Sequence, residues 1–368
     1  MAFIQLNYTV KNYAKQINKD DFSSYVLGVD IGGTNTNLGV AGIKNNRPAL
    51  LLSINFKSRE INSFTLLVKE TLEYTKKQHG IKINHACIGA AGIVSVNQNF
   101  ADLTNIEWDV NTDKLLQETA LQSAFIINDF QAIGYGINLL NQNNTNDIFK
   151  VRDVANLNDP SKATKAILGA GTGLGKSILI YDEQLNVYIP ISSEGGHSDF
   201  PAQNDFEFKL LEFIKNLSNF SEPVCYEELL SGRGIESIYL YLKQSSSKET
   251  GYSKEIEEAA DKAALISKYR PVDDTCKEAF QLFARFYGRC AKNFVLDTMA
   301  TGGLYIAGGI ASKNKDIFLS NEFLDEFENA YQRDDVLKQT PIYVIMNYDV
   351  SLYGACFAAM YKNLEEII

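Results

Sequence analysis

The feature that most constrains the fold of this chain is a strand, a glycine turn and a second strand, found in two places. The first is LGVDIGGTNTNLGV at residues 27–40, which the strand-like segment LLSINF follows. The second begins with KAILGAGTGLG at residue 165 and continues through SILIYD and NVYIPI. Short β-rich segments separated by turn residues are typical of antiparallel strands. Because the two places share an order of elements but no sequence repeat, we expect two lobes, each with its own sheet.

The remaining segments alternate between helix and strand. Apolar residues at helical spacing over 64–74 stop at Gly80, and the strands HACIGAAGI and FIIND follow. A polar linker, NQNNTNDIFK to NLNDPSK, separates the two halves. Helical segments dominate from about 205 to 300, and the strands GGLYIAGGI and PIYVIM precede a terminal helix around 351–365. This alternation predicts an α/β protein, and a length of 368 residues favours two lobes at roughly 150 residues per domain.

Charge and cysteine usage limit the possible partners and compartment. The chain has 45 acidic and 35 basic residues, for a formal charge of −10, and no block dense in Lys or Arg, so we expect no nucleic-acid partner. Five cysteines are scattered singly, which is typical of thiols in a reducing compartment. The N-terminus lacks a signal-peptide pattern, and no run approaches the roughly 20 apolar residues that cross a bilayer. We therefore expect a cytoplasmic protein without a membrane partner.

The first glycine turn could hold a phosphate group. Gly32 and Gly33 permit positive φ and let backbone N–H groups approach an anion, while Thr34 and Asn35 add side-chain donors. A plain hairpin turn needs glycine no less, so the turn alone favours neither interpretation. Asp30 lies on the apolar strand just before it, where a carboxylate could hold Mg²⁺ through water. A brace for the turn is the structural alternative for Asp30.

The second glycine turn nearly matches a nucleotide-binding P-loop. Residues 169–177 read GAGTGLGKS, but Ala170 stands at the leading glycine position of that motif. A β-hairpin pattern follows, whereas a P-loop requires a helix N-terminus that points at the phosphates. We therefore reject the P-loop and predict a turn between strands, in which Gly171 and Gly173 flank Thr172 as a donor.

A third glycine element is GGLYIAGGI at 302–310, a buried strand that ends in Gly308 and Gly309. Residues this small would let a flat ring lie close to the backbone. Connections from strand to helix often use glycine, so this signal is weak by itself. The segment ASKNKDIFLSNEFLDEF that follows is expected to be helical.

The segment FIINDF at 125–130 places a carboxylate, Asp129, at the end of an apolar strand. Burying an unpaired charge costs several kcal/mol, so Asp129 must lie at a cavity mouth, at a helix cap or beside a partner. One structural interpretation makes Asp129 the N-cap of the helix FQAIGYGINLL. A rigid position at a cleft is compatible with that role.

In this order, these elements resemble the bacterial ATP-dependent glucokinases of the hexokinase–actin–heat-shock-chaperone superfamily. The resemblance extends from about Tyr25 to the C-terminus and is carried by VDIGGTN, LTNIEW, IINDF, GAGTGLG, EGGH, LLSGRG and LYIAGGI. It implies a two-lobed actin-like ATPase (ribonuclease H-like) fold, with a mixed sheet flanked by helices in each lobe and the active site in the interlobe cleft. The implied division is an N-terminal extension 1–24, a small lobe of 25–139 plus 347–368, and a large lobe 140–346.

The resemblance also implies an activity. A glucokinase transfers the γ-phosphate of Mg-ATP to the 6-hydroxyl of D-glucose and releases glucose 6-phosphate and ADP. Asp129, in IINDF, would accept the hydroxyl proton as general base. The implied sugar-binding residues are Asn105, Asn128, Glu194, His197 and Glu227. The implied ATP-binding residues are Asp30, Gly32, Gly33, Thr34, Asn35, Gly171, Thr172, Gly173, Gly308 and Gly309.

Further expectations follow from the same resemblance. Mg²⁺ would be held at Asp30, through water, and the protein would be a homodimer. Sugar binding would close the cleft and exclude water, with hinges near 139–141 and 347. Where related glucokinases often have Pro, LLSGRG has Arg233, which lies beside the nucleotide region and is expected to affect nucleotide preference more than sugar binding.

Two other functions remain compatible with the sequence. One is a kinase for another hexose, such as mannose or an amino sugar, because the motifs fix the machinery for phosphorylating a hydroxyl better than the sugar's stereochemistry. The other is a non-catalytic sugar-sensing regulator of the same fold. Related regulators carry an added DNA-binding helix-turn-helix of about sixty residues, and the extension 1–24 is shorter and weakly basic.

Overall fold

The computed structural model describes residues 7–103, 106–154, 162–246 and 251–365. The chain forms two compact units. The first comprises Met1–Leu140, Asp182–Pro190 and Tyr348–Ile368, and the second comprises Asn141–Tyr181 and Ile191–Asn347. The segment Asp182–Pro190, which the sequence places in the large lobe, belongs to the first unit because its apolar side chains at 185, 187 and 189 pack into that unit's core.

The first unit is built on a six-stranded sheet in the order β1-β4-β3-β2-β5-β9. Its strands are β1 (Tyr8–Asn12), β2 (Ser24–Ile31), β3 (Asn35–Lys44), β4 (Arg47–Lys57), β5 (His85–Ala90) and β9 (Ser123–Asn128). The pairs β2–β3 and β3–β4 are antiparallel, which confirms the predicted meander, and β2, β5 and β9 run parallel. A smaller sheet contains β6 (Gly92–Val94), β7 (Phe100–Leu103) and β8 (Val110–Asn111).

The segment expected to be an extension contributes an edge strand. β1 pairs antiparallel with β4, from Tyr8 opposite Phe56 to Asn12 opposite Leu52. The ring of Tyr8 lies 5.4 Å from that of Phe56. The described part of residues 1–24 is therefore integral to the first unit, because backbone pairing with β4 recruits a segment that is mostly polar.

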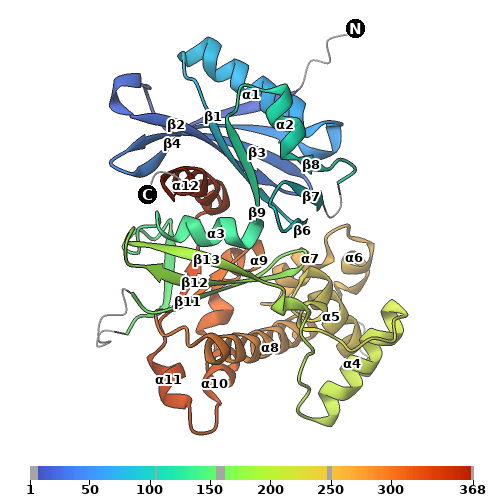
Figure 1. Cartoon of the computed structure of the whole chain (residues 1–368). Helices are drawn as coiled ribbons and strands as arrows, with labels where there is room; N and C mark the ends of the chain where they lie inside the picture. The colour runs from blue at the N-terminus through green and yellow to red at the C-terminus, as the bar shows by residue number, and fades with distance from the viewer. Residues whose placement is uncertain (1–6, 104–105, 155–161, 247–250, 366–368) are drawn as a thin grey trace. The chain divides into compact units, whose positions relative to one another are not determined.

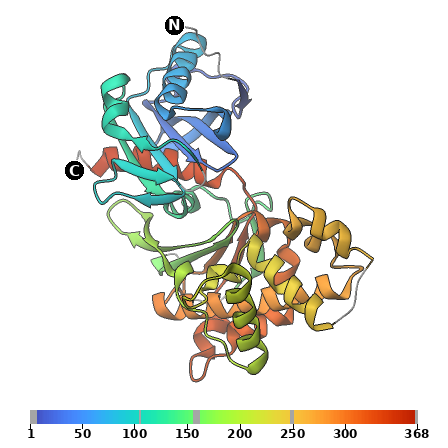
Figure 2. The ribbon, with the colours of Figure 1, turned by 90° about the vertical axis from the view of Figure 1, so that its right-hand side faces the viewer.

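Helices cover both faces of this sheet. They are α1 (Phe64–His79), α2 (Thr112–Glu118), α3 (Asp129–Ile137) and α12 (Val350–Glu365). Gly80 ends α1 with φ of 63°, which confirms the predicted stop. Side chains that alternate along the strands pack against α1 on one face and against α12 with α3 on the other. Figure 2 shows α12, in red, and α1, in light blue, on opposite faces of the sheet.

A second six-stranded sheet has the order β10-β15-β14-β11-β12-β13 and belongs to the second unit, except that β13 begins within the segment Asp182–Pro190 of the first unit. Its strands are β10 (Ile148–Arg152), β11 (Lys165–Ala170), β12 (Leu174–Asp182), β13 (Val187–Ser193), β14 (Leu304–Ala307) and β15 (Ile342–Ile345). β14 is parallel to β11 and β15, while β12 is antiparallel to β11. β10 lies within the segment predicted to be a linker, because pairing with β15 buries Ile148.

Helices dominate the rest of this unit (Figure 1). They are α4 (Asp205–Ser218), α5 (Gly232–Ser246), α6 (Ser253–Glu258), α7 (Lys262–Tyr269), α8 (Asp274–Thr298), α9 (Gly309–Lys313), α10 (Asn321–Glu328) and α11 (Asp334–Gln339). Short 3₁₀ turns are η4 (Gly195–His197), η5 (Tyr226–Glu228) and η6 (Lys315–Leu319). The helix expected after β14 is divided into α9, η6 and α10. Among the described residues, no helix has the length and apolar character needed to span a membrane.

Candidate active site

In the first unit, the predicted site residues lie where three parallel strands end. The register of β2, β5 and β9 aligns Asp30 with Gly89, and Ala90 with Asn128. Asp30 and the Asn128–Asp129 pair therefore lie at the same carboxyl edge of the sheet. In open α/β sheets, ligands bind outside the carboxyl ends of the strands.

Asn128, rather than Asp129, is the N-cap of α3. The side-chain oxygen of Asn128 accepts a hydrogen bond from the Phe130 N–H at 2.8 Å. The Gln131 side chain accepts one from the Asn128 N–H at 3.1 Å, which completes a capping box. The cap prediction was therefore wrong by one residue, and Asp129 is the first residue of the helix.

The Asp129 carboxylate is half-buried and oriented by the helix backbone. Its Oδ1 accepts a hydrogen bond from the same Phe130 N–H at 2.9 Å. The positive end of the helix dipole favours a negative charge at this position. Asp129 is thus a fixed carboxylate at a sheet edge, whereas the side-chain NH₂ of Asn128 retains the capacity to donate to a ligand.

Asp30 is partly buried and hydrogen-bonded from α12. Its Oδ1 accepts a hydrogen bond from the Ser351 hydroxyl at 2.7 Å. Burial raises the pKa of Asp30, and hydrogen bonds from Ser351 and Asn37 act in the opposite direction. One carboxylate beside a glycine turn fits Mg²⁺, which keeps several waters and needs only one or two carboxylates. Within the described ranges, no group of three or more His, Cys, Asp or Glu side chains gathers as a metal site.

The turn after β2 begins with two glycines, Gly32 and Gly33. Neither Gly32 nor Gly33 has a positive φ, so the conformational reason given for them is wrong. A Cβ added at Gly33 would meet no atom within 4 Å, which leaves the backbone open to approach. The Lys57 ammonium donates to Asn35 Oδ1 at 2.8 Å and brings a positive charge to the turn that the sequence did not reveal. Thr34 is exposed beside it.

In the second unit, the other glycines gather where β11 and β14 end. The parallel register pairs Gly169 with Ala307, so the turns after these strands are neighbours. Gly308 has φ of 96°, and a Cβ there would lie 2.5 Å from the Ala170 carbonyl oxygen, so only glycine fits. A Cβ added at Gly171 or Gly309 would meet no atom within 4 Å. Thr172, between Gly171 and Gly173, is exposed.

The rejection of the P-loop is consistent with the structure. Residues 174–182 form β12, so no helix N-terminus follows the GAGTG turn. Instead, the start of α5 meets the turn, because the Gly232 N–H donates to the Gly171 carbonyl oxygen at 2.9 Å. No local sequence pattern indicates this contact, because it joins segments 61 residues apart.

The segments that carry Glu194, His197 and Glu227 lie side by side. The Tyr226 N–H donates to the Ser198 carbonyl oxygen at 3.0 Å, in a short antiparallel bridge that joins η5 to the residues after η4. Glu194 and His197 are exposed, and the carboxylate and the imidazole are 3.9 Å apart. These side chains are therefore accessible to a ligand.

Glu227 links this cluster to the glycine turn. Its Oε2 accepts a hydrogen bond from the Leu174 N–H at 2.9 Å, and its Oε1 lies 2.6 Å from the guanidinium of Arg233. Arg233 also lies 2.9 Å from Glu228 Oε1. Arg233 was expected to affect nucleotide preference, but it directly contacts a predicted sugar-binding carboxylate.

Lys176, the lysine of the near match to a P-loop, is a buried cation. Its Nζ lies 5.1 Å from the ring centre of Tyr226 and 5.0 Å from that of Phe294. A Cβ added at Gly195 would lie 3.0 Å from the Lys176 side chain. The Lys176 side chain therefore packs against both the segment that carries Glu194 and the segment that carries Glu227.

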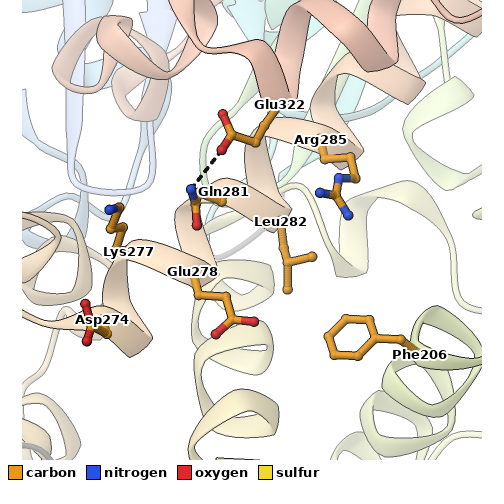
Figure 3. Close-up of a pocket in the computed structure, with 8 residues that line it drawn as sticks. All are labelled: Phe206, Asp274, Lys277, Glu278, Gln281, Leu282, Arg285 and Glu322. Atoms are coloured by element: carbon orange, nitrogen blue, oxygen red, sulfur yellow. Dashed lines mark hydrogen bonds between the residues drawn. The ribbon is translucent and has the colours of Figure 1, made fainter.

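One predicted sugar-binding residue, Asn105, falls outside the described residues. A cavity of about 530 Å³ in the second unit, shown in Figure 3, contains none of the predicted site residues. It is lined by Phe206, Asp274, Lys277, Glu278, Gln281, Leu282, Arg285 and Glu322.

Comparison with known proteins identifies the family. The family model described as Glucokinase matches residues 27–362. A glucokinase from Nostoc sp. is 36% identical over 352 residues, covering 91% of this chain and 98% of that protein. A glucokinase from Synechocystis sp. is 32% identical over 354 residues, covering 90% and 97%.

Solved glucokinases share the fold. The structure from an Antarctic psychrotroph has a TM-score of 0.76 and 24% identity, covering 92% of this chain and 99% of that one. The structure from Balamuthia mandrillaris, determined with glucose, has a TM-score of 0.72 and 21% identity, covering 91% and 93%. These similarities support the actin-like ATPase fold expected from the sequence. With a family model matched over residues 27–362, the chain belongs to the glucokinase family.

Proposed function

We propose that this protein transfers the γ-phosphate of Mg-ATP to the 6-hydroxyl of D-glucose, with Asp129 as the general base. The observation that carries the proposal is the fixed, half-buried carboxylate of Asp129 at the first turn of α3. Phosphoryl transfer requires accurate alignment and charge stabilisation more than covalent participation by the protein. A rigid carboxylate at a sheet edge suits that requirement.

Asp129 accepts the proton of the sugar hydroxyl as the bond to phosphorus forms. A carboxylate is a weak base for an alcohol, so this transfer occurs late, when the hydroxyl has become acidic. A carboxylate has about four lone-pair sites, and the Phe130 N–H takes one of those of Asp129. The product is glucose 6-phosphate, and ADP leaves.

The proposed ligands of the sugar hydroxyls are Asn128, Glu194, His197 and Glu227. Asn105 is a further proposed sugar ligand. A site made of such polar groups discriminates against a sugar in which one hydroxyl is inverted, because a protein donor or acceptor is then left unpaired. We propose glucose rather than another hexose because the chain belongs to the glucokinase family.

ATP binds along the glycine turns. The turns at 32–35 and 171–173 would contact the phosphates through N–H groups other than those of Gly32 and Gly171, which donate to the Asn35 and Gly173 carbonyl oxygens at 2.9 and 2.8 Å. The paired glycines 308 and 309 would admit the adenosine close to the backbone. Lys57 adds positive charge near the first turn. Asp30 would hold Mg²⁺ through water, and the bound ion would neutralise part of the charge on the phosphate oxygens.

We also propose a cytoplasmic homodimer. All five cysteines are free thiols in the structure, as is usual in a reducing compartment where ATP is abundant. The dimer is proposed from the resemblance to bacterial glucokinases. Size-exclusion chromatography with light scattering should give about twice the chain mass of 41.0 kDa, and a single-chain mass would contradict the dimer.

The test of function is a sugar panel in a coupled assay for ADP release. Glucose, mannose, glucosamine and fructose are compared at matched concentrations with Mg-ATP. We expect the highest kcat/KM for glucose. A higher kcat/KM for mannose or glucosamine would reassign the substrate, and the absence of ADP release with every sugar would favour the non-catalytic regulator.

A further inference from the structure

We propose that Arg233 is a positioning residue for the sugar subsite, which holds the Glu227 carboxylate in one orientation. The inference rests on the proposed function, because it takes Glu227 as a sugar ligand. It goes further by assigning a role in glucose affinity to a residue outside the set of proposed contacts.

Three hydrogen bonds in the second unit form a closed link around Glu227. Its Oε1 accepts from the Arg233 guanidinium at 2.6 Å, and its Oε2 accepts from the Leu174 N–H at 2.9 Å. Arg233 follows Gly232, whose N–H donates to the Gly171 carbonyl oxygen at 2.9 Å. The turn at 171–174, the carboxylate and the start of α5 therefore fix one another.

The space beside Glu227 admits little rearrangement on the turn side. A Cβ added at Gly173 would lie 2.5 Å from Glu227 Oε2, so this carboxylate oxygen packs directly on the turn backbone. On the other side, only the Arg233 bond holds Oε1 in the described structure. Without Arg233, we expect the Glu227 carboxylate to change its orientation while it keeps the hydrogen bond from the Leu174 N–H.

Charge gives Arg233 a second effect. The Glu227 side chain is only 16% exposed, and Glu228 is its neighbour in the chain. The single guanidinium contacts both carboxylates, so it offsets their mutual repulsion. A carboxylate accepts at roughly four sites, so with two occupied, others remain for sugar hydroxyls.

The planar fork of arginine matters for this role. It presents donors in a fixed geometry, whereas a lysine ammonium is a flexible point charge. Arg233 is 54% exposed, so the ion pair itself contributes modestly to folding. Its effect should consequently appear in sugar binding more than in stability.

The experiment compares Arg233→Ala, Arg233→Lys, Glu227→Gln and the double variant Arg233→Ala/Glu227→Gln, with Arg285→Ala as the matched control. Arg285 is an exposed arginine of the same unit, on α8, so its removal changes the net charge equally. Calorimetry measures glucose Kd, steady-state kinetics give kcat and both KM values, and thermal melts check folding.

We expect Arg233→Ala to raise the glucose Kd about fivefold, with kcat and KM for ATP changed less than about twofold. Arg233→Lys should recover part of this loss. In the Glu227→Gln background, Arg233→Ala should change the glucose Kd less than about twofold, since the two residues act through one contact. Arg285→Ala should leave every constant unchanged.

Two results would overturn the inference and are distinguishable from failure of the proposed function. If Glu227→Gln weakens glucose binding but Arg233→Ala and Arg233→Lys do not, Glu227 keeps its role and Arg233 loses its own. If the Arg233 variants raise KM for ATP as much as KM for glucose, Arg233 acts on the nucleotide side. Unchanged glucose Kd in Glu227→Gln would instead remove Glu227 from the sugar site, and the inference with it.

Discussion

Gly354 of α12 lies against the backbone of Ala132 in α3, so closely that a Cβ added at Gly354 would be 1.7 Å from the Ala132 carbonyl oxygen. The contact is reinforced at Gly136, where a Cβ would lie 2.3 Å from the Val350 carbonyl oxygen. Because α3 begins at Asp129, this backbone-to-backbone packing fixes the direction of the helix that carries the proposed base.

Gly354→Ala should therefore destabilise the protein and reduce activity together. Overpacking of this kind typically costs about 1–3 kcal/mol, and the clash here is with backbone, which cannot rotate away. Urea denaturation gives the free energy of unfolding. The control is Gly251→Ala, where a Cβ would meet no atom within 4 Å. An unchanged free energy of unfolding in Gly354→Ala would contradict the described packing of α3 on α12.

The buried ion pair between Arg289 and Glu207 should be essential for folding of the second unit. The guanidinium contacts the carboxylate at 2.6 and 3.0 Å, and both side chains are almost fully buried. Arg289→Met leaves the Glu207 charge uncompensated, which typically costs about 3–5 kcal/mol. Lys338→Met is the control, because its pair with Asp334 is exposed and should contribute little to stability. Equal losses in the two variants would be inconsistent with this difference.

The same pair predicts a pH dependence. Burial opposes the charge on Glu207, but hydrogen bonds from Arg289 and from the Gln203 N–H outweigh it and hold the pKa of Glu207 below its ordinary value of 4.5. An acid whose pKa is lowered by folding stabilises the protein above its unfolded pKa and loses that contribution as pH falls through the folded pKa. The difference in unfolding free energy between wild type and Glu207→Gln should therefore be constant above pH 4.5 and shrink below it. A difference that grows on acidification would have the wrong sign.

Lys165 predicts a second rise of stability with pH, in the alkaline range. Burial lowers the pKa of Lys165 from 10.5 to about 8. Between these values the unfolded chain binds more protons than the folded one, so this residue makes stability rise with pH. Lys165→Met should remove that rise, so wild type should gain stability relative to the variant between pH 8 and 10.5. A flat difference across this range, measured by urea denaturation, would rule out the shift.

Elements with strong local patterns were predictable from the sequence. The strands β2, β3 and β4 and the helix α1 with its stop at Gly80 follow from alternation, helical spacing and turn residues. The order of the glycine turns along the chain indicated the family, because that order is read directly from the sequence. Local sequence patterns are sufficient to predict these features.

Features that depend on distant contacts were not predictable. β1 and β10 are strands because they pair with β4 and β15, and neither segment has a strong pattern of its own. The cap of α3 was misplaced by one residue because Asn and Asp are nearly equal N-caps, and the choice depends on how β9 ends. Arg233 could not be paired with Glu227 without knowing where η5 ends and α5 begins.

The most direct measurement of the central claim is the kcat of Asp129→Asn under saturating glucose and Mg-ATP. The amide oxygen of Asn can still accept from the Phe130 N–H, so the helix terminus should persist while the base is lost. We predict a decrease in kcat of at least about 100-fold, with ATP binding unchanged. A kcat within about twofold of wild type would contradict the assignment of Asp129 as the general base.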